Sequence, residues 1–114
     1  MERRLKAFRF AFNGLTIFFS ETFHARIHFF AALVVCFFGF YLQVSKVEWI
    51  ALILCMTLVF ITEALNSALE YVVDLATIEI HPLAKKAKDV AAAAVLLAAA
   101  FSSIIAAIIF IPYF

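Results

Sequence analysis

Four polar residues recur along one apolar segment of the chain. In TEALNSALEYVVD, residues 62–74, the polar positions Glu63, Asn66, Glu70 and Asp74 are spaced 3, 4 and 4 residues apart. At about 100° per residue on an α-helix, they fall in one stripe roughly 80° wide. Carboxylates with an amide on one face suit a divalent cation, and a carboxylate also suits the role of general base. This stripe is therefore the first candidate for chemistry.

A cationic cluster follows the stripe. In EIHPLAKKAKD, residues 79–89, three lysines precede Asp89. Lysines suit phosphate groups, so stripe and cluster together fit phosphoryl transfer, in which metal and lysine position the phosphates and neutralise their charge. No glycine-rich phosphate loop is present. We therefore expect side chains, rather than a backbone cradle, to hold any nucleotide.

The chain that carries these residues is unusually apolar. It has 114 residues, of which 68% are hydrophobic, with two glycines and two prolines, and its mean hydropathy is +1.11. A soluble domain of this size could not bury so much apolar surface, so lipid must solvate most of it. The formal charge of +1 argues against a nucleic-acid-binding protein. Cys36 and Cys55 lie in apolar runs, and we expect buried, reduced thiols.

Three apolar segments predict three membrane-spanning helices. They cover about residues 27–44, 47–61 (apolar on one side as far as 75) and 90–114, and each reaches the roughly 20 residues of a span once its flanks are included. Residues 3–20 place polar and apolar positions on opposite faces, which is typical of a helix in the membrane interface. We therefore expect an all-α membrane protein, with an N-terminal interfacial amphipathic helix plus three transmembrane helices, as a single domain over residues 1–114.

Basic residues indicate the orientation in the membrane. They gather before the first apolar segment and between the second and third. The positive-inside rule then puts the N-terminus and the loop at residues 79–89 in the cytoplasm. Trp49 and Tyr113 mark the outer interface, and Glu63, 14 residues beyond Trp49, lies about 21 Å deeper. The polar stripe therefore opens toward the cytoplasm, where ATP is found.

Other functions also use ionisable residues inside spanning helices. Helix association through hydrogen bonds would explain one such residue, but not four on one face followed by a cationic cluster. A proton or cation transporter uses intramembrane carboxylates as relays, yet it does not need lysines at the cytoplasmic mouth. A non-catalytic membrane subunit of the same fold is a third hypothesis. ATP turnover that requires an added lipid alcohol separates a kinase from both.

Two segments of the chain closely resemble the signature of the small bacterial integral-membrane diacylglycerol kinases and their undecaprenol kinase relatives. They are EALNSALEYVVDL and EIHPLAKKAKDVAAAAVL. The resemblance covers most of the chain, including ARIH ahead of the first span. It implies an ATP-dependent lipid kinase of the bacterial inner membrane, which uses Mg²⁺ and phosphorylates diacylglycerol or undecaprenol directly. It also implies a homotrimer with active sites shared between subunits. HPLAKKAKD is closer to the undecaprenol kinase branch, although it does not determine specificity.

The resemblance also implies roles for individual residues. Glu63 is similar to the general base that takes the proton from the lipid hydroxyl, and Asn66 to its polar partner in the pocket. Glu70 resembles a ligand of Mg²⁺ or Mg-ATP. Five further residues resemble nucleotide contacts of the family: Arg3, Glu79, His81, Lys88 and Asp89. Of these, Lys88 and Asp89 resemble the two residues that bind the nucleotide together.

One position departs from the family pattern. The family has a second metal-binding glutamate before the first span, and ungapped alignment on Gly14 and on residues 26–28 puts Thr22 there. A neutral hydroxyl brings no anionic charge to Mg²⁺. We therefore expect the adjacent Glu21 to supply the carboxylate through a small rotation of the helix.

The three histidines do not have the spacing of a zinc site. His24 and His28 are one helical turn apart, and we expect both to anchor the chain at the interface. The run AAAAVLLAAAFSS, which begins at Ala91, is rich in small residues and predicts a surface for close helix packing.

Overall fold

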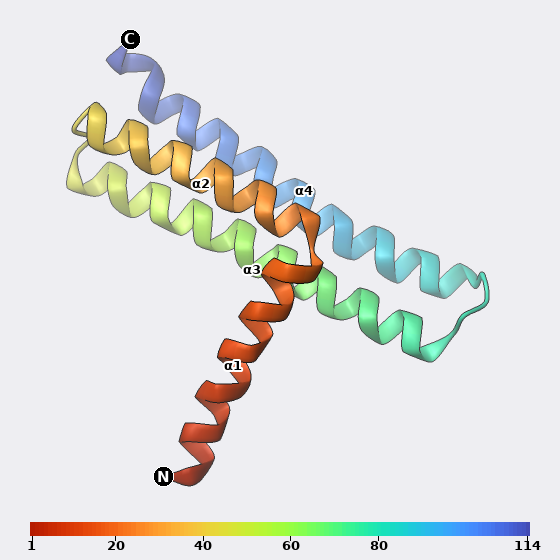
Figure 1. The fold of residues 1–114 in the computed structure, drawn as a ribbon. Helices are drawn as coiled ribbons and strands as arrows, with labels where there is room; N and C mark the ends of the chain where they lie inside the picture. The colour runs from red at the N-terminus through yellow and green to blue at the C-terminus, as the bar shows by residue number, and fades with distance from the viewer.

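The computed structural model describes residues 1–114 and contains helices without strands. The elements are α1 (Glu2–Glu21), α2 (Phe23–Tyr41), α3 (Lys46–Ala76), α4 (Pro82–Phe110) and a closing 3₁₀ turn, η1 (Ile111–Tyr113). Helices α2, α3 and α4 run side by side with alternating direction, and α1 projects away from them (Figure 1). The polar stripe lies on α3, so its prediction as helix is confirmed.

Local signals in the sequence explain where the helices begin and end. Ser45 and Glu48 form a capping box at the start of α3, in which each side chain pairs with the other residue's backbone N–H. At the start of α4, the His81 ring accepts a hydrogen bond from the backbone of Leu83, and Pro82 takes the first helical position. Helix α4 therefore begins at Pro82, eight residues before the third apolar segment, and carries the lysine cluster as helix rather than loop.

The three long helices meet the requirements of membrane spans. Phe23–Tyr41, Lys46–Ala76 and the segment from Pro82 to Tyr113 are all long and apolar enough to cross a bilayer. Only nine of 114 residues are buried, and the accessible surface is 8901 Å². A compact soluble monomer of this mass would expose about 6,300 Å². The excess surface is largely apolar, so the prediction of an all-α membrane protein is confirmed.

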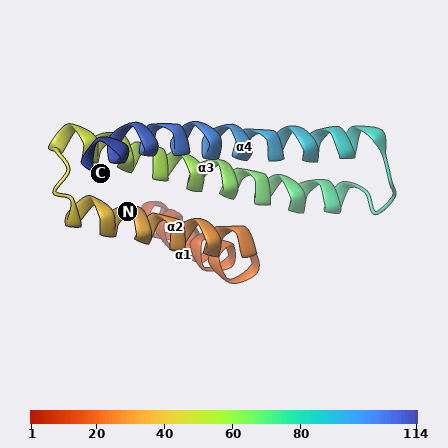
Figure 2. The same cartoon turned by 90° about the horizontal axis from the view of Figure 1, so that it is seen from above.

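Helices α3 and α4 form the closest pair in the bundle. They pack along most of their length, whereas α2 lies in a second layer and contacts α3 more sparsely (Figure 2). One face of the small-residue run on α4 makes this contact, with Ala98 buried and Ala91, Val95 and Ala99 half-buried. The prediction of a close packing surface therefore holds for this face and not for the whole run.

The end of the bundle near the turn between α2 and α3 is fixed by two contacts. The Trp49 ring lies against Gly39 so closely that a Cβ on Gly39 would come within 2.6 Å of it. The Tyr113 hydroxyl donates a hydrogen bond to the Glu48 carboxylate. Trp49 and Tyr113 therefore lie at the same end of the bundle, as the orientation predicted from the sequence requires.

Helix α1 leaves the bundle at Thr22, whose backbone is extended between two helices. Phe18 is the only buried residue of α1, and Phe19 packs edge-on against Phe29 and Phe60. The rest of its apolar stripe, Leu5, Phe8, Phe12 and Leu15, is exposed. An apolar face that the bundle does not cover is what a helix in the membrane interface presents to lipid.

Candidate active site

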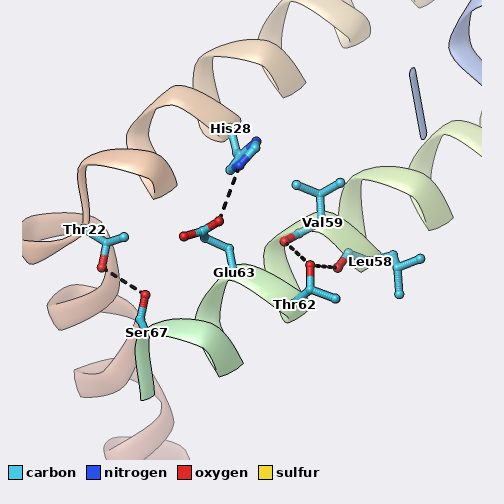
Figure 3. Close-up of polar contacts among 7 residues, drawn as sticks. All are labelled: Thr22, His28, Leu58, Val59, Thr62, Glu63 and Ser67. Atoms are coloured by element: carbon cyan, nitrogen blue, oxygen red, sulfur yellow. Dashed lines mark hydrogen bonds and ion pairs between the residues drawn. The ribbon is translucent and has the colours of Figure 1, made fainter. Parts of the chain in front are cut away.

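Glu63 lies on the face of α3 that meets α2. It is 3% exposed and is the only charged residue among the buried ones. Its Oε2 lies 3.6 Å from Nε2 of His28 on α2 (Figure 3). One turn further along α3, the Ser67 and Thr22 hydroxyls share a hydrogen bond of 3.4 Å. Two polar contacts therefore join the start of α2 to the middle of α3, one made by the carboxylate itself and one a turn further along α3.

Asn66 has a buried acceptor with no partner. Its side-chain Oδ1 makes no hydrogen bond and is hidden from solvent, although the residue as a whole is half-buried. A buried polar atom without a partner costs about 1–3 kcal/mol. Oδ1 is therefore available to a donor or a cation that enters the site. The role of Asn66 as the polar partner of Glu63 stays a prediction.

Glu70 and Glu21 lie near the same group, although they belong to different helices. Both residues are exposed, and both carboxylates act electrostatically on the phenol of Tyr71 on α3. The Thr22 hydroxyl is instead directed to Ser67. Glu21 is therefore the one carboxylate at the end of α1, and its role as a metal ligand stays a prediction.

A cleft of about 490 Å³ opens where α3 turns into α4. Four residues predicted to contact nucleotide line it, together with Asp74 and Lys85: Glu79, His81, Lys88 and Asp89. Both lysines of the cleft pair with acidic residues. Lys88 Nζ lies 2.7 Å from Asp74 Oδ1, and Lys85 Nζ lies 2.6 Å from Asp89 Oδ2. Lys88 and Asp89 therefore share the cleft without pairing with each other.

The base candidate and the cleft are separated along α3. Asp74 follows Glu63 by 11 residues, or about 16 Å of helix, and Glu70 lies between them. Arg3 lies outside this arrangement. It is exposed near the free end of α1, 18 residues or about 27 Å from Glu21 (Figure 1). Apart from Arg3, the predicted site residues of a single chain lie along the second half of α3, at the α3–α4 turn and at the end of α1.

The donor atoms of the site fit Mg²⁺. Mg²⁺ prefers oxygen ligands and is usually held by one or two carboxylates together with waters and substrate phosphates. Glu70 and Glu21 would supply two carboxylates, and Asn66 an acceptor that has no partner in the protein. No group of three or more His, Cys, Asp or Glu side chains gathers in the structure, so a closed cage made of protein ligands alone is absent.

Sequence reasoning assigned His28 to the interface, whereas the structure turns its imidazole to Glu63. It also missed the Thr22–Ser67 contact and the pairing of Lys88 with Asp74. One signal pointed to His28: a titratable side chain next to an apolar run is costly unless it has a partner. The identity of that partner depends on how α2 is placed against α3.

Comparison with known proteins identifies the family of the chain. The family described as prokaryotic diacylglycerol kinase matches residues 9–110. The undecaprenol kinase of Bacillus subtilis is 45% identical over 87 residues, which cover 76% of this chain and 71% of that protein. The diacylglycerol kinase of Synechocystis sp. is 40% identical over 109 residues, covering 95% of this chain and 62% of the relative. That of Helicobacter pylori is 38% identical over 104 residues, covering 91% of this chain and 81% of the relative. Because the family match spans most of its length, this chain belongs to the prokaryotic diacylglycerol kinase family and is a lipid kinase.

Proposed function

We propose that this protein transfers the γ-phosphate of ATP directly to the hydroxyl of a membrane lipid, either diacylglycerol or undecaprenol. The observation that carries the proposal is a buried carboxylate, Glu63, on the same face of one helix as a cleft that gathers lysines. A carboxylate at membrane depth takes a proton from a lipid hydroxyl, and lysines at the helix end hold phosphates.

Glu63 acts as the general base in this proposal. Its carboxylate accepts the proton of the lipid hydroxyl as the lipid oxygen bonds to the γ-phosphorus and the bond to the ADP leaving group breaks. Asn66, three residues later on α3, has a buried acceptor without a partner, which would hold a donor or a cation beside the reacting hydroxyl. Glu63 is 3% exposed, so little bulk water competes with the lipid hydroxyl for its carboxylate.

The cleft between α3 and α4 holds the nucleotide. Lys88 contacts the phosphates, and Glu79, His81 and Asp89 line the remaining walls. Lys88 can leave Asp74 at little cost, because both side chains are well exposed and such pairs contribute about 0–1 kcal/mol. Glu70, between the cleft and Glu63, would hold Mg²⁺ together with Glu21. A bound Mg²⁺ neutralises charge on the phosphates during transfer.

The proposed assembly takes the position of Arg3 into account. Since α1 carries Arg3 away from the cleft of its own chain, a contact of Arg3 with nucleotide would require the site of a neighbouring subunit. This supports a homotrimer with sites shared between subunits. We place residues 1–114 as one membrane-embedded kinase domain in the bacterial inner membrane, with the N-terminus and the α3–α4 turn in the cytoplasm, because basic residues gather at both.

A direct assay tests the proposal and the choice of lipid together. Purified protein in proteoliposomes is given Mg-ATP with diacylglycerol, with undecaprenol, or with no added lipid alcohol. We expect ATP turnover that requires one of the two alcohols and yields its phosphate. Apolar pockets distinguish acyl from isoprenoid chains weakly, so the ratio of the two rates must be measured. Ion flux without ATP, or no turnover with either lipid, would contradict the proposed function.

A further inference from the structure

Glu63 has one ion-pair partner in the protein, and that partner is His28. Their side chains are 4% and 22% exposed, and Nε2 lies 3.6 Å from Oε2 (Figure 3). This distance is slightly beyond a hydrogen bond, and contacts between catalytic groups commonly shorten when the substrate binds. His28 lies five residues into α2, about 8 Å from its start. It is thus more exposed than Glu63 and near a helix end.

The rest of the surroundings of His28 offers no competing charge. It lines one end of an apolar groove of about 230 Å³ between α2, α3 and α4. From α3, Cys55 is the only other titratable group in that groove, and α4 contributes two serines and no charge. Ser102 donates to the Cys55 carbonyl and Ser103 to the Ala99 carbonyl, so both hydroxyl protons are already used. On α2 itself, His24 and Arg26 are exposed.

A buried base must lose its proton before it can act again. Glu63 is almost entirely enclosed, and a buried carboxylate exchanges protons with bulk water only through a neighbouring group. Histidine is the side chain whose charge changes most readily between pH 5 and 8, which suits it to carry protons. His28 is the ion-pair partner of Glu63, and its side chain is the more exposed of the two, at 22% against 4%.

We propose that His28 accepts, through Nε2, the proton that Glu63 takes from the lipid hydroxyl, and releases it to water. The proposal rests on the proposed role of Glu63. In each turnover the proton leaves the lipid oxygen for Glu63 Oε2, passes to His28 Nε2 and then to solvent, while the phosphoryl group moves from ATP to the lipid oxygen. His28 does not touch the substrate. It is a positioning residue that acts through Glu63 and resets it.

The test compares His28→Gln with His24→Gln, which removes an exposed imidazole one turn earlier. The rate is measured from pH 5.5 to 9 in proteoliposomes with Mg-ATP and the preferred lipid. General acid–base groups contribute about 10²–10⁴-fold to the reaction rate. Because His28 acts through Glu63 and not on the substrate, we expect a smaller effect, a fall in kcat of His28→Gln of about tenfold or more. KM for the lipid should stay unchanged, and the pH dependence of kcat should change shape. Imidazole in the buffer should raise kcat of His28→Ala, which a purely structural role would not do.

The His24→Gln enzyme should keep the wild-type pH profile. A His28→Gln enzyme with wild-type kcat and pH profile, beside an inactive Glu63→Gln enzyme, overturns this inference alone. An active Glu63→Gln enzyme contradicts the role of Glu63 itself. If His28→Gln does not fold, wild-type kcat in mixtures of H₂O and D₂O decides. If two protons are transferred, a plot of kcat against the deuterium fraction of the solvent is curved. A linear plot overturns the proposal.

Discussion

Replacing Lys88 by alanine should weaken ATP binding and leave lipid binding intact. Lys88 Nζ lies in the cleft at the α3–α4 turn and pairs with Asp74 at 2.7 Å. The two side chains are 39% and 66% exposed, so the pair itself contributes at most about 1 kcal/mol. A charged hydrogen bond from Lys88 to a phosphate contributes about 1–3 kcal/mol. Its loss should therefore raise KM for ATP about 5- to 150-fold.

The assay is initial velocity against ATP concentration at saturating lipid, and against lipid at saturating ATP. Lys86→Ala is the matched control, because Lys86 carries the same charge two residues earlier on α4 and does not line the cleft. Asp74→Asn is a second control: it frees Lys88 from its partner and should leave KM for ATP unchanged or lower it. If Lys88→Ala keeps its ATP affinity and loses lipid affinity, the cleft faces the lipid and the reasoning fails.

Two further predictions concern α1 and the packing of the bundle. Glu21→Ala should raise the Mg²⁺ concentration needed for half-maximal activity, whereas Thr22→Glu should change little or interfere, because neighbouring helical residues point about 100° apart. If Glu21→Ala is fully active and Thr22→Glu gains activity at limiting Mg²⁺, the metal-binding position is residue 22 and not residue 21. Gly39→Ala should lower stability by about 1–3 kcal/mol, because its Cβ would meet the Trp49 ring at 2.6 Å. Thermal unfolding in detergent measures this, with Gly14→Ala, which meets nothing within 4 Å, as the control; equal stability of both variants would contradict the packing.

Periodicity in the sequence was sufficient to predict the helices and the polar stripe. The spacing of apolar residues along a helix determines which face is apolar and which is polar. This spacing can be read from the local sequence alone. The three spans and the amphipathic N-terminal helix follow from it. The start of α4 was placed too late, because a lysine-rich segment at a membrane surface can extend a helix beyond its apolar part.

Contacts between helices could not be predicted in the same way. The pairing of His28 with Glu63 depends on the rotation and the offset of α2 against α3, and sequence spacing fixes neither. The same is true of Lys88, which could pair along its own helix but reaches across to Asp74 on α3. The adjacent Asp89 pairs within α4 with Lys85, four residues earlier, a contact that spacing does allow one to anticipate.

The central claim is that Glu63 is the base of a lipid kinase. It is tested most directly by the transfer of label from γ-labelled ATP to the preferred lipid, measured for wild type and for Glu63→Gln in the same proteoliposomes. The amide keeps the shape of the side chain and cannot accept the proton. We expect Glu63→Gln to fold, to assemble as wild type does and to form no labelled lipid at any pH. Near-normal labelling by Glu63→Gln would contradict the account.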